Sequence, residues 1–586
     1  MGGLYLIRES DDAGARITAA EAQFERHGFR TFTPVSASGF TGFHAAPYHG
    51  GAHGPESLVE EGGDLIAVAG TLSYDGKLGR PALTQLLQEF SFPFEDWDRL
   101  HGQFVLFVRK GGRSYLVTDY FAAFQLFHDP DDRIFSTSFL AAAGSLDRVS
   151  FDPQGLYEFA FNVFPTGNDS VLKEVQRIGP RQQVELGDPV TRSAVEKPLP
   201  DNAARRPLGD RIGRTADLLR ALTAPFAAHY GDRMQCPLSG GLDSRLALAM
   251  LRDAGVRPHV YVYGAPGDGD VEIARAIAKG ERFDLEVFEK AKHAEVSPDE
   301  FAAQVERNFH ETDALVTDGG LFDNGGNAAA RHARQEGGQL AVSGGCGEVF
   351  RNFFYLPDRR MTAREVVGAF FARYTNADVV NEFKPERFLA NLEAKALRAV
   401  GEEHEGRKLP RPVIEQLYPR MRCRAFFGRE ISLVGRQGGY MMPFFDHKVV
   451  AEALTLPIGL KNAGKFESAL LTHIDPKLAS YPSGYGYAFD DKVTFEHRMS
   501  EFGTRVRPPW MRKRSYALRR RLGPIEDEHG GLLTPAYLGR VLDLHFPHMR
   551  RFFRTENIAD SGLYRRVATL EYLAQYLEGH LADRPG

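Results

Sequence analysis

The chain has 586 residues, of which 43% are hydrophobic and 25% are charged. These ordinary globular values exclude a disordered or fibrous chain, and the length predicts two to four domains at roughly 150 residues each. With 72 Lys and Arg against 77 Asp and Glu, the net charge of −5 argues against a general nucleic-acid binder. The 3 cysteines form no Cys-x-x-Cys pair, which argues against a zinc or disulfide framework and favours the cytoplasm. No stretch reaches the ~18 apolar residues of a membrane span.

The first 150 residues predict short strands separated by turns. The expected strands are runs of β-branched and aromatic residues at 65–70, 103–110, 114–120 and 133–138. The turn Lys-Gly-Gly-Arg at 110–113 joins two of these runs and predicts a hairpin. A further strand is expected near 182–186, before a linker rich in Pro, Asp and Arg near 197–208. The first domain is therefore expected to be rich in antiparallel sheet.

From about residue 210 the pattern changes to alternating strands and helices. Strands are expected at 233–238, 259–264, 284–289 and 339–344, and helices at 242–255 and 271–280. This alternation indicates a parallel sheet covered on both faces. From about residue 360 the pattern is mostly helical. The expected fold class is thus α/β combined with α+β.

The strongest motif is Ser-Gly-Gly-Leu-Asp-Ser at 239–244, between an expected strand and an expected helix. Two glycines allow the backbone to approach an anion closely, and the helix that follows presents free N–H groups. Ser239 and Ser244 add hydroxyl donors, whereas Asp243 would repel phosphate unless it holds a divalent cation. The motif predicts a phosphate site. It lacks the GxxxxGK[ST] pattern of a Walker loop.

The motif resembles the PP-loop of the ATP pyrophosphatases, and other segments resemble the class B asparagine synthetase superfamily. These segments follow in the family's order: 263–280, SGGCGEVF at 343–350, and MMPFFDHKVVAEALTLP at 441–457. Residues 1–150 resemble the Ntn-type glutamine amidotransferase domain of that family. The resemblance implies three parts: an amidotransferase-like domain with linker at 1–205, a PP-loop synthetase domain at 206–500, and a basic helical extension at 501–586.

The resemblance also implies a site for ATP and Mg²⁺. The residues it assigns to ATP are Ser239, Gly240, Gly241, Asp243, Ser244, Tyr263, Gly264, Ser343 and Gly344. Asp243 and Glu348 are expected to hold the metal and to be catalytic. The family's late lysine, which stabilises departing pyrophosphate, has no counterpart in the segment 481–487. Lys465 and Lys492 flank that segment, and Lys465 is assigned the catalytic role.

Other departures concern the supply of the amine. Family amidotransferase domains expose a cysteine at the mature N-terminus, whereas this chain begins Met-Gly-Gly and its first cysteine is Cys236. The glutamine-binding Asn-Gly-Glu segment is replaced by Ala69-Gly70-Thr71. The ammonia-orienting Glu of asparagine synthetases is replaced by Gly345. We therefore expect no glutaminase activity, as in the β-lactam synthetases and lasso-peptide cyclases of this superfamily.

The segment 505–521 carries many Arg and Lys and no acid, with Trp510 and Tyr516 interspersed. It is interpreted either as a solvated helix face or as a surface that binds an acidic partner. That partner could be a precursor peptide or processing protein, a lipid headgroup or nucleic acid, and nucleic acid is the least favoured.

The expected function is an ATP-dependent ligase that adenylates a carboxylate and joins it to a substrate amine, in peptide or natural-product maturation. Three alternatives remain. An ammonia-dependent asparagine synthetase is disfavoured by Gly345, and a PP-loop tRNA-modifying enzyme by the absence of Cys-x-x-Cys. A catalytically inactive binding protein is disfavoured by the intact motif at 239–244.

Overall fold

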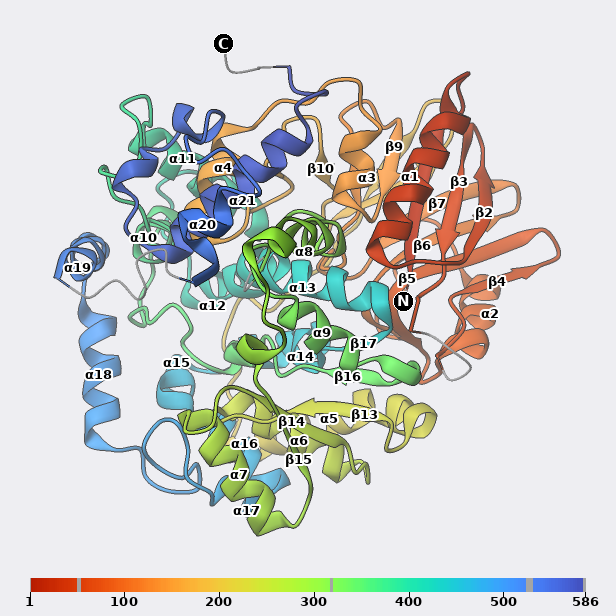
Figure 1. The fold of residues 1–586 in the computed structure, drawn as a ribbon. Helices are drawn as coiled ribbons and strands as arrows, with labels where there is room; N and C mark the ends of the chain where they lie inside the picture. The colour runs from red at the N-terminus through yellow and green to blue at the C-terminus, as the bar shows by residue number, and fades with distance from the viewer. Residues whose placement is uncertain (1, 50–53, 317–319, 523–530, 583–586) are drawn as a thin grey trace.

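The structure is a computed structural model that describes residues 2–49, 54–316, 320–522 and 531–582 (Figure 1). It is a mixed α/β protein with antiparallel sheets near the N-terminus, a parallel sheet in the middle of the chain and a mostly helical part after it. No helix among the described residues is both long and apolar enough to cross a membrane.

The N-terminal region contains two six-stranded sheets, whose strand orders are β10-β8-β9-β1-β3-β2 and β12-β11-β7-β6-β5-β4. The first sheet comprises β1 (Gly3–Arg8), β2 (Phe32–Ala37), β3 (Phe40–Ala45), β8 (Phe127–His128), β9 (Ile134–Ser136) and β10 (Gln176–Arg177). The second comprises β4 (Leu58–Glu61), β5 (Asp64–Tyr74), β6 (Leu100–Lys110), β7 (Arg113–Thr118), β11 (Gln182–Leu186) and β12 (Thr191–Ala194). All of these pairs are antiparallel.

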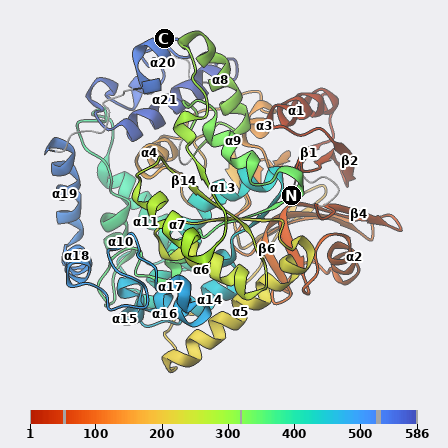
Figure 2. The same cartoon turned by 60° about the horizontal axis from the view of Figure 1, so that its bottom comes forward.

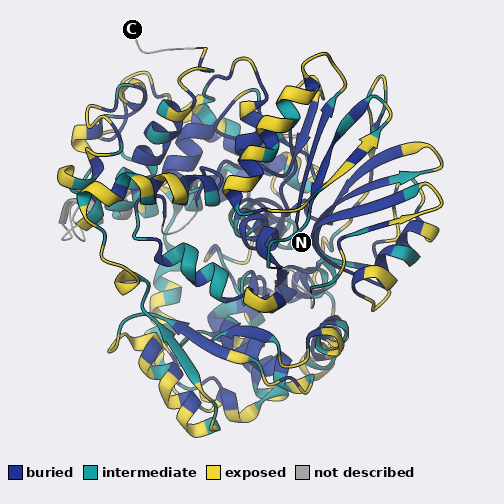
Figure 3. Cartoon of the chain, turned by 45° about the vertical axis from the view of Figure 1, so that its right-hand side comes forward, coloured by how far each residue is buried: buried dark blue, intermediate teal, exposed yellow. Residues whose placement is uncertain are grey.

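The predicted hairpin is confirmed, because β6 pairs with β7 from Val105 and Thr118 down to the turn between Lys110 and Arg113. Both strands are buried along most of their length, as expected of a strand covered on both faces (Figure 3). The strand expectation missed the helices of this region: α1 (Ala13–His27), α2 (Gly79–Glu89), α3 (Phe139–Gly144) and α4 (Pro153–Asn162). Apolar faces such as Leu83, Leu86 and Leu87 of α2 hold them against the sheets.

The second predicted region forms a five-stranded parallel sheet in the order β15-β14-β13-β16-β17. Its strands are β13 (Met234–Pro237), β14 (His259–Tyr263), β15 (Leu285–Phe288), β16 (Leu340–Val342) and β17 (Gly439–Met441). Helices α5 (Leu208–Tyr230), α6 (Leu242–Asp253), α7 (Gly269–Glu281), α8 (Pro298–Glu311) and α9 (Gly326–Ala333) lie between or before these strands. The sheet runs from β13 outward through β14 to β15, and then resumes on the other side of β13 with β16. Such a change of direction is where open parallel sheets bind ligands, beyond the carboxyl ends of their strands.

The remaining part of the chain is helical and returns to the N-terminal region. It comprises α10 (Ala363–Phe370), α11 (Pro385–Val400), α12 (Arg411–Glu415), the π-helical turn η5 (Tyr418–Cys423), α13 (Arg424–Gln437), α14 (His447–Leu454), α15 (Ile458–Lys461), α16 (Lys465–Ile474), α17 (Pro476–Ala479), α18 (Phe495–Val506), α19 (Pro509–Leu522), α20 (Pro535–Leu538) and α21 (Ser561–Tyr576). Helix α21 packs against α4, and Val149 forms a β-bridge with Leu581. Helices α18 and α19 lie on the side of the molecule opposite to β2 and β4 (Figures 1 and 2).

Buried polar contacts join the N-terminal sheets to the helical part. Asp313, which is fully buried, accepts the backbone N–H groups of Phe139 and Leu140 at 2.8 Å and forms an ion pair with Arg436 at 2.8 Å. In α13, Ser432 accepts the N–H of Gln125 at 2.9 Å. Because these groups satisfy one another away from water, they specify how the two regions dock.

Candidate active site

The Ser-Gly-Gly loop connects β13 to α6, as the sequence predicts. The hydroxyl groups of Ser239 and Ser244 lie 2.8 Å apart, and the Ser244 hydroxyl accepts the N–H of Ser239 at 3.0 Å. Ser239 in turn accepts the N–H of Gly241 at 3.2 Å. These short-range contacts hold the loop in a tight bend directly before the N-terminus of α6, with Gly241 at the cap position. The bend therefore places the loop backbone next to the positive end of a helix dipole.

The middle of the loop already binds an anionic group. The N–H of Gly240 donates to the carboxylate of Asp270, in α7, at 2.8 Å. A Cβ atom at position 240 would lie only 2.9 Å from the backbone nitrogen of Gly484 and 3.0 Å from Asp270 Oδ1. Glycine is thus required for the close approach of these two segments. A loop whose N–H donates to a carboxylate in this way can favour an anionic group.

The segment 481–487, where the family's lysine is missing, covers this loop. The N–H of Gly484 donates to the carbonyl of Gly240 at 3.0 Å. The fully buried Arg245, in α6, holds the segment by donating to the carbonyl of Tyr481 at 2.9 Å and to that of Pro482. Lys465 and Lys492 are both exposed, and within the described residues Lys465 lines no cavity beside the loop. The structure therefore does not bring Lys465 to the other candidate residues, and its role stays a prediction.

Asp243 and Glu348, the two predicted metal ligands, lie near an arginine that the sequence reasoning missed. Arg351 forms an ion pair with Asp243 through Nη2, and its Nε lies 3.2 Å from Glu467 Oε2. Its Nη1 donates to the hydroxyl of Tyr485 at 2.8 Å. Glu467, at the start of α16, is fully buried. The site thus gathers carboxylates from α6, the segment after β16 and α16 around one guanidinium.

Two glycines of the segment 343–348 let Asp243 lie against it. A Cβ at Gly347 would fall 2.0 Å from Asp243 Oδ1, and a Cβ at Gly344 would fall 2.9 Å from the Asp243 carbonyl. Neither distance leaves room for a side chain, so only glycine permits this packing. At Gly345, where asparagine synthetases have a glutamate, a Cβ would meet the Met442 and Phe427 side chains at 2.8 and 3.0 Å.

Burial and mutual repulsion shift the pKa values of the acidic groups in this site. Burial raises the pKa of Glu348, and the nearby charge of Asp243 raises it further. Burial also raises the pKa of Glu467 well above its ordinary value, again with the charge of Asp243 acting in the same direction. For Arg351, burial opposes protonation, but the carboxylates of Asp243, Glu467 and Glu348 outweigh it and raise the pKa. Because three carboxylates share a single arginine, burial and their mutual repulsion favour the protonated forms of Glu348 and Glu467.

The position of Glu348 depends on Tyr418, in η5. The Tyr418 hydroxyl donates to Glu348 Oε2 at 2.6 Å. Burial raises the pKa of Tyr418 well above its ordinary value, so its hydroxyl remains a donor. The sequence reasoning missed Tyr418, Glu467 and Arg351. In the sequence, Glu467 is a charged residue inside the apolar run 466–471, and Arg351 lies one helical turn after Glu348; these two features could have pointed to them.

Two carboxylate oxygens of this cluster lack a partner. Asp243 Oδ1 and Glu467 Oε1 are buried without a hydrogen-bond partner among the described residues, whereas Glu467 Oε2 lies beside Arg351. Unpartnered buried carboxylate oxygens are costly, and a hard cation such as Mg²⁺ prefers oxygen ligands of this kind. Asp243, Glu348 and Glu467 are nevertheless not close enough to share an ion as they stand, because within the described residues only His101, Asp446 and His447 bring three such ligand atoms within 4.8 Å of one another.

Tyr263 is the last residue of β14, the strand next to β13, and Gly264 follows it, so both lie at the same edge of the sheet as the loop. The Lys290 ammonium lies 3.9 Å from the centre of the Tyr263 ring. Ser343 and Gly344 follow β16 on the other side of β13, and the Ser343 hydroxyl accepts the N–H of Gly345 at 3.1 Å. All predicted ATP-binding residues therefore gather at the carboxyl edge of the parallel sheet.

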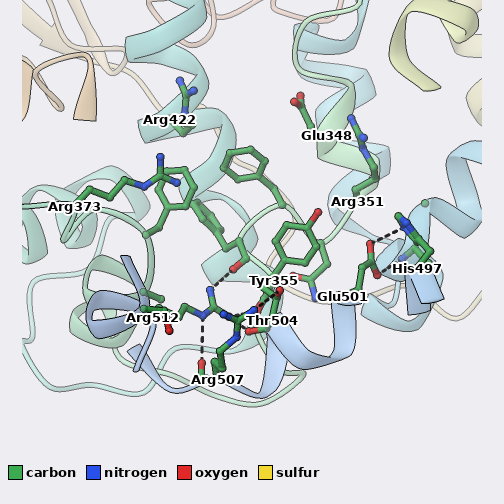
Figure 4. Close-up of a pocket in the computed structure, with 18 of the residues that line it drawn as sticks. Glu348, Arg351, Tyr355, Arg373, Arg422, His497, Glu501, Thr504, Arg507 and Arg512 are labelled. Atoms are coloured by element: carbon green, nitrogen blue, oxygen red, sulfur yellow. Dashed lines mark hydrogen bonds and ion pairs between the residues drawn. The ribbon is translucent and has the colours of Figure 1, made fainter. Parts of the chain in front are cut away.

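A cavity of about 820 Å³ opens beside Glu348 and Arg351 (Figure 4). Its lining comes from Leu242, the segment 348–355, the C-terminal end of α10 and the residues after it, Arg422, α18 and α19. Much of its lining is aromatic: Phe353, Phe354, Tyr355, Phe370, Tyr485 and Tyr487. Its volume suits a small ligand rather than a folded partner.

The N-terminal region has no cysteine to serve as a glutaminase nucleophile, since the chain's cysteines, Cys236, Cys346 and Cys423, are all buried elsewhere. Gly2 has a φ of +103°, and a Cβ there would lie 2.4 Å from the carbonyl of Ala45. A side chain at this position would be strained as well as crowded.

No protein-family model matches the chain, and no curated protein matches it. Among solved structures, it is similar to glutamine phosphoribosylpyrophosphate amidotransferase from B. subtilis complexed with ADP and GMP, at 10% identity and a TM-score of 0.23, over 49% of this chain and 65% of that one. It is also similar to a structure described as the allosteric regulatory enzyme of purine biosynthesis, at 11% identity and a TM-score of 0.22, over 49% of this chain and 64% of that one. The chain thus spans slightly less than two thirds of each of these proteins.

Proposed function

We propose that this protein is an ATP-dependent ligase that activates a substrate carboxylate as an acyl-adenylate and transfers the acyl group to an amine of its substrate. One observation carries the proposal. The glycine loop at 239–241 and the carboxylates of Asp243, Glu348 and Glu467 converge at the carboxyl edge of a parallel sheet, beside a cavity large enough for a second substrate. An anion-binding loop next to oxygen ligands for Mg²⁺ suits the triphosphate of ATP.

In the first step, an oxygen of the substrate carboxylate attacks the α-phosphorus of ATP. The bond between the α-phosphorus and the bridging oxygen breaks, which releases pyrophosphate and leaves the acyl-adenylate. Mg²⁺, when bound, would neutralise charge on the departing pyrophosphate. The N–H groups of residues 239–241 would hold the phosphates after exchanging their present acceptors, Ser244, Asp270 and Ser239, for phosphate oxygens. Arg351 supplies a positive charge beside Asp243.

In the second step, the substrate amine attacks the acyl carbon. The bond to the AMP oxygen breaks, so AMP leaves, and the amine loses a proton as the amide forms. The proposed amine belongs to the substrate, because Gly345 provides no carboxylate for ammonia and Gly2 no nucleophile for glutamine hydrolysis. An amine bound in the same cavity as the acyl group gains the advantage of prior orientation.

Exchange of labelled pyrophosphate into ATP across a panel of carboxylates tests the first step. The proposal expects exchange with one class of acid, and loss of that exchange in the Asp243→Asn variant. With the complete substrate, AMP, pyrophosphate and amide should form in equal amounts without glutamine or ammonium. If no acid of the panel supports exchange while ATP still binds, the protein is a binding-only relative.

A second candidate is an ammonia-dependent asparagine synthetase, which the same loop and carboxylates would serve. Aspartate with ammonium is expected to be a poor substrate pair, because the space at Gly345 is filled by Met442 and Phe427. Efficient, saturable asparagine formation would favour this candidate over the proposed ligase.

A further inference from the structure

The cavity beside the carboxylates is lined by more positive than negative groups (Figure 4). Its charged lining consists of Glu348, Arg351, Arg373, Arg422, Glu501, Arg507, Arg512 and Lys513. The two acids have partners of their own. Glu348 accepts the Tyr418 hydroxyl, and Glu501 accepts the N–H of Ala463 at 2.8 Å and lies 3.6 Å from His497. Arg351 is paired with Asp243 and Glu467. The other cations determine the charge of the remaining space.

Among the cations that line the cavity, Arg422 has an environment that an anion would stabilise. Its Nη1 is buried and has no hydrogen-bond partner among the described residues, and no carboxylate in that part of the chain forms an ion pair with it. Its guanidinium instead lies 3.7 Å from the centre of the Phe426 ring and 4.8 Å from that of Phe164. The Arg422 side chain as a whole is half-buried and lines the cavity, and Glu348 is a source of negative charge that acts on it. An anion in the cavity would supply the ion pair that its guanidinium lacks.

The helices of the basic segment supply further cations to the same space. Arg512, in α19, donates to the carbonyls of Phe354 at 2.9 Å and Thr504 at 3.0 Å, so its position is held by neutral groups and its charge is not cancelled. Arg507 likewise donates to the carbonyl of Gly503 and the hydroxyl of Thr504. Lys513 lies 3.8 Å from the centre of the Tyr374 ring. In the described parts of the chain, none of these three pairs with a carboxylate.

The neighbouring residues of α19 face elsewhere. Trp510 is 57% exposed, and Arg514, which is exposed, lies 5.4 Å from the Trp510 ring and does not line the cavity. The segment 505–521 predicted from its charge is therefore divided between the cavity and the surface. The side chain of Tyr516 and those of residues 519–521 lie outside the described residues. Whether the exposed part binds an external partner stays a prediction.

We propose that the cavity selects a substrate that carries a second anionic group, a carboxylate or a phosphate, in addition to the carboxylate that is activated. The reacting carboxylate would lie toward Glu348 and Arg351, and the second anion toward Arg422, Arg512 and Lys513. The aromatic side chains between them, such as Phe353 and Phe370, whose rings are 5.1 Å apart, would contact an apolar or planar middle portion. This inference rests on the proposed function for the identity of the reacting group, but not for the binding of the second anion.

Three acids built on the same ring test the inference: 1,4-phenylenediacetate, 4-(phosphonomethyl)phenylacetate and 4-methylphenylacetate. Their affinities for the full chain are measured by calorimetry at low and high NaCl, with and without Mg²⁺ and α,β-methylene-ATP. At least one of the first two acids should bind about tenfold more tightly than the methyl compound, and added salt should reduce that advantage. Comparison of the two distinguishes a carboxylate from a phosphate as the second anion.

Lys513→Gln should reduce the affinity for the preferred dianion about fivefold to tenfold and leave that for 4-methylphenylacetate unchanged. Arg422→Gln should have the same selectivity with a larger effect. The matched control is Arg514→Gln, which removes the same charge from the next residue of α19 but not from the cavity. If Arg422→Gln does not fold, the comparison of Lys513→Gln with Arg514→Gln still tests the inference.

Equal affinities for the three acids, no binding of any of them at millimolar concentration, or equal losses in the Lys513→Gln and Arg514→Gln variants would each overturn the inference. Selective binding of a dianion without pyrophosphate exchange would leave the inference standing and refute the proposed ligase function instead. The two failures are therefore distinguishable.

Discussion

Replacement of Gly347 by alanine tests whether the placement of Asp243 matters for the chemistry. The added Cβ would lie 2.0 Å from Asp243 Oδ1 and 2.7 Å from its Cγ. A relaxed contact between such atoms is about 3.5 Å, so the carboxylate must move by roughly 1 Å or more. Gly347 has no positive φ, so the backbone itself accepts alanine. The perturbation is thus confined to the distance between Asp243 and its neighbours.

A displacement of about 1 Å at a catalytic group costs about 100-fold in rate, or roughly 2.7 kcal/mol of activation free energy. We therefore expect Gly347→Ala to exchange pyrophosphate about 100-fold more slowly than the unmodified protein, with the acid that supports its exchange. The matched control is Gly459→Ala, because a Cβ at position 459 would meet no atom within 4 Å and Gly459 also has no positive φ.

The assay compares the exchange rates of both variants after circular dichroism and thermal unfolding have shown that each is folded. Gly459→Ala should retain the full rate. If Gly347→Ala retained it as well, Asp243 would not need its observed position, and the argument that it holds the metal beside the loop would fail.

Three further predictions concern other parts of the molecule. Asp243→Asn and Glu348→Gln should each slow pyrophosphate release about 100-fold or more, because they remove charge that stabilises the transition state, and near-native release by Glu348→Gln would refute its assignment. Incubation of the protein with glutamine should release no glutamate above background; hydrolysis abolished by a mutation in residues 1–205 would contradict this. Burial raises the pKa of Glu571 to about 7, so the folded protein retains a proton that the unfolded chain loses at lower pH. The free energy of unfolding should therefore fall as the pH rises from about 4.5 to 7. Glu571→Gln should flatten this pH dependence and recover up to about 3 kcal/mol of stability at pH 8, as measured by urea unfolding. A pH profile unchanged by the substitution would show that Glu571 is ionised in the folded state.

Much of the parallel sheet was predictable because its elements depend on local patterns. The strand expected at 259–264 is β14 (His259–Tyr263), and the helix expected at 242–255 is α6 (Leu242–Asp253). Short apolar strands next to amphipathic helices can be recognised from the sequence pattern of some ten residues. The strand expectation for the first 150 residues missed helices α1 and α2, although their apolar residues recur at helical spacing.

The candidate site was predictable in part. Asp243 lies within a motif of six residues, and Glu348 follows a recognisable strand, so both could be assigned from the sequence. Glu467 comes from α16, which shares no motif with Asp243 or Glu348. Arg351 acquires its role only through its contacts with Asp243 and Glu467. Lys465, assigned by its distance along the chain, is exposed.

The sequence by itself determined the local structure of the loop at 239–244, since two glycines and two serines directly before a helix start bend the backbone through neighbouring groups alone. Only the tertiary structure decided which charges surround the cavity. The cavity takes Arg373 from the segment after α10, Arg422 from η5 and Arg512 from α19, which are separated by up to about 140 positions. Their convergence depends on how distant helices pack, and charge counted along the segment 505–521 cannot show which of its cations face inward. The physical reason is that side-chain direction follows from burial against distant elements, which no local pattern specifies.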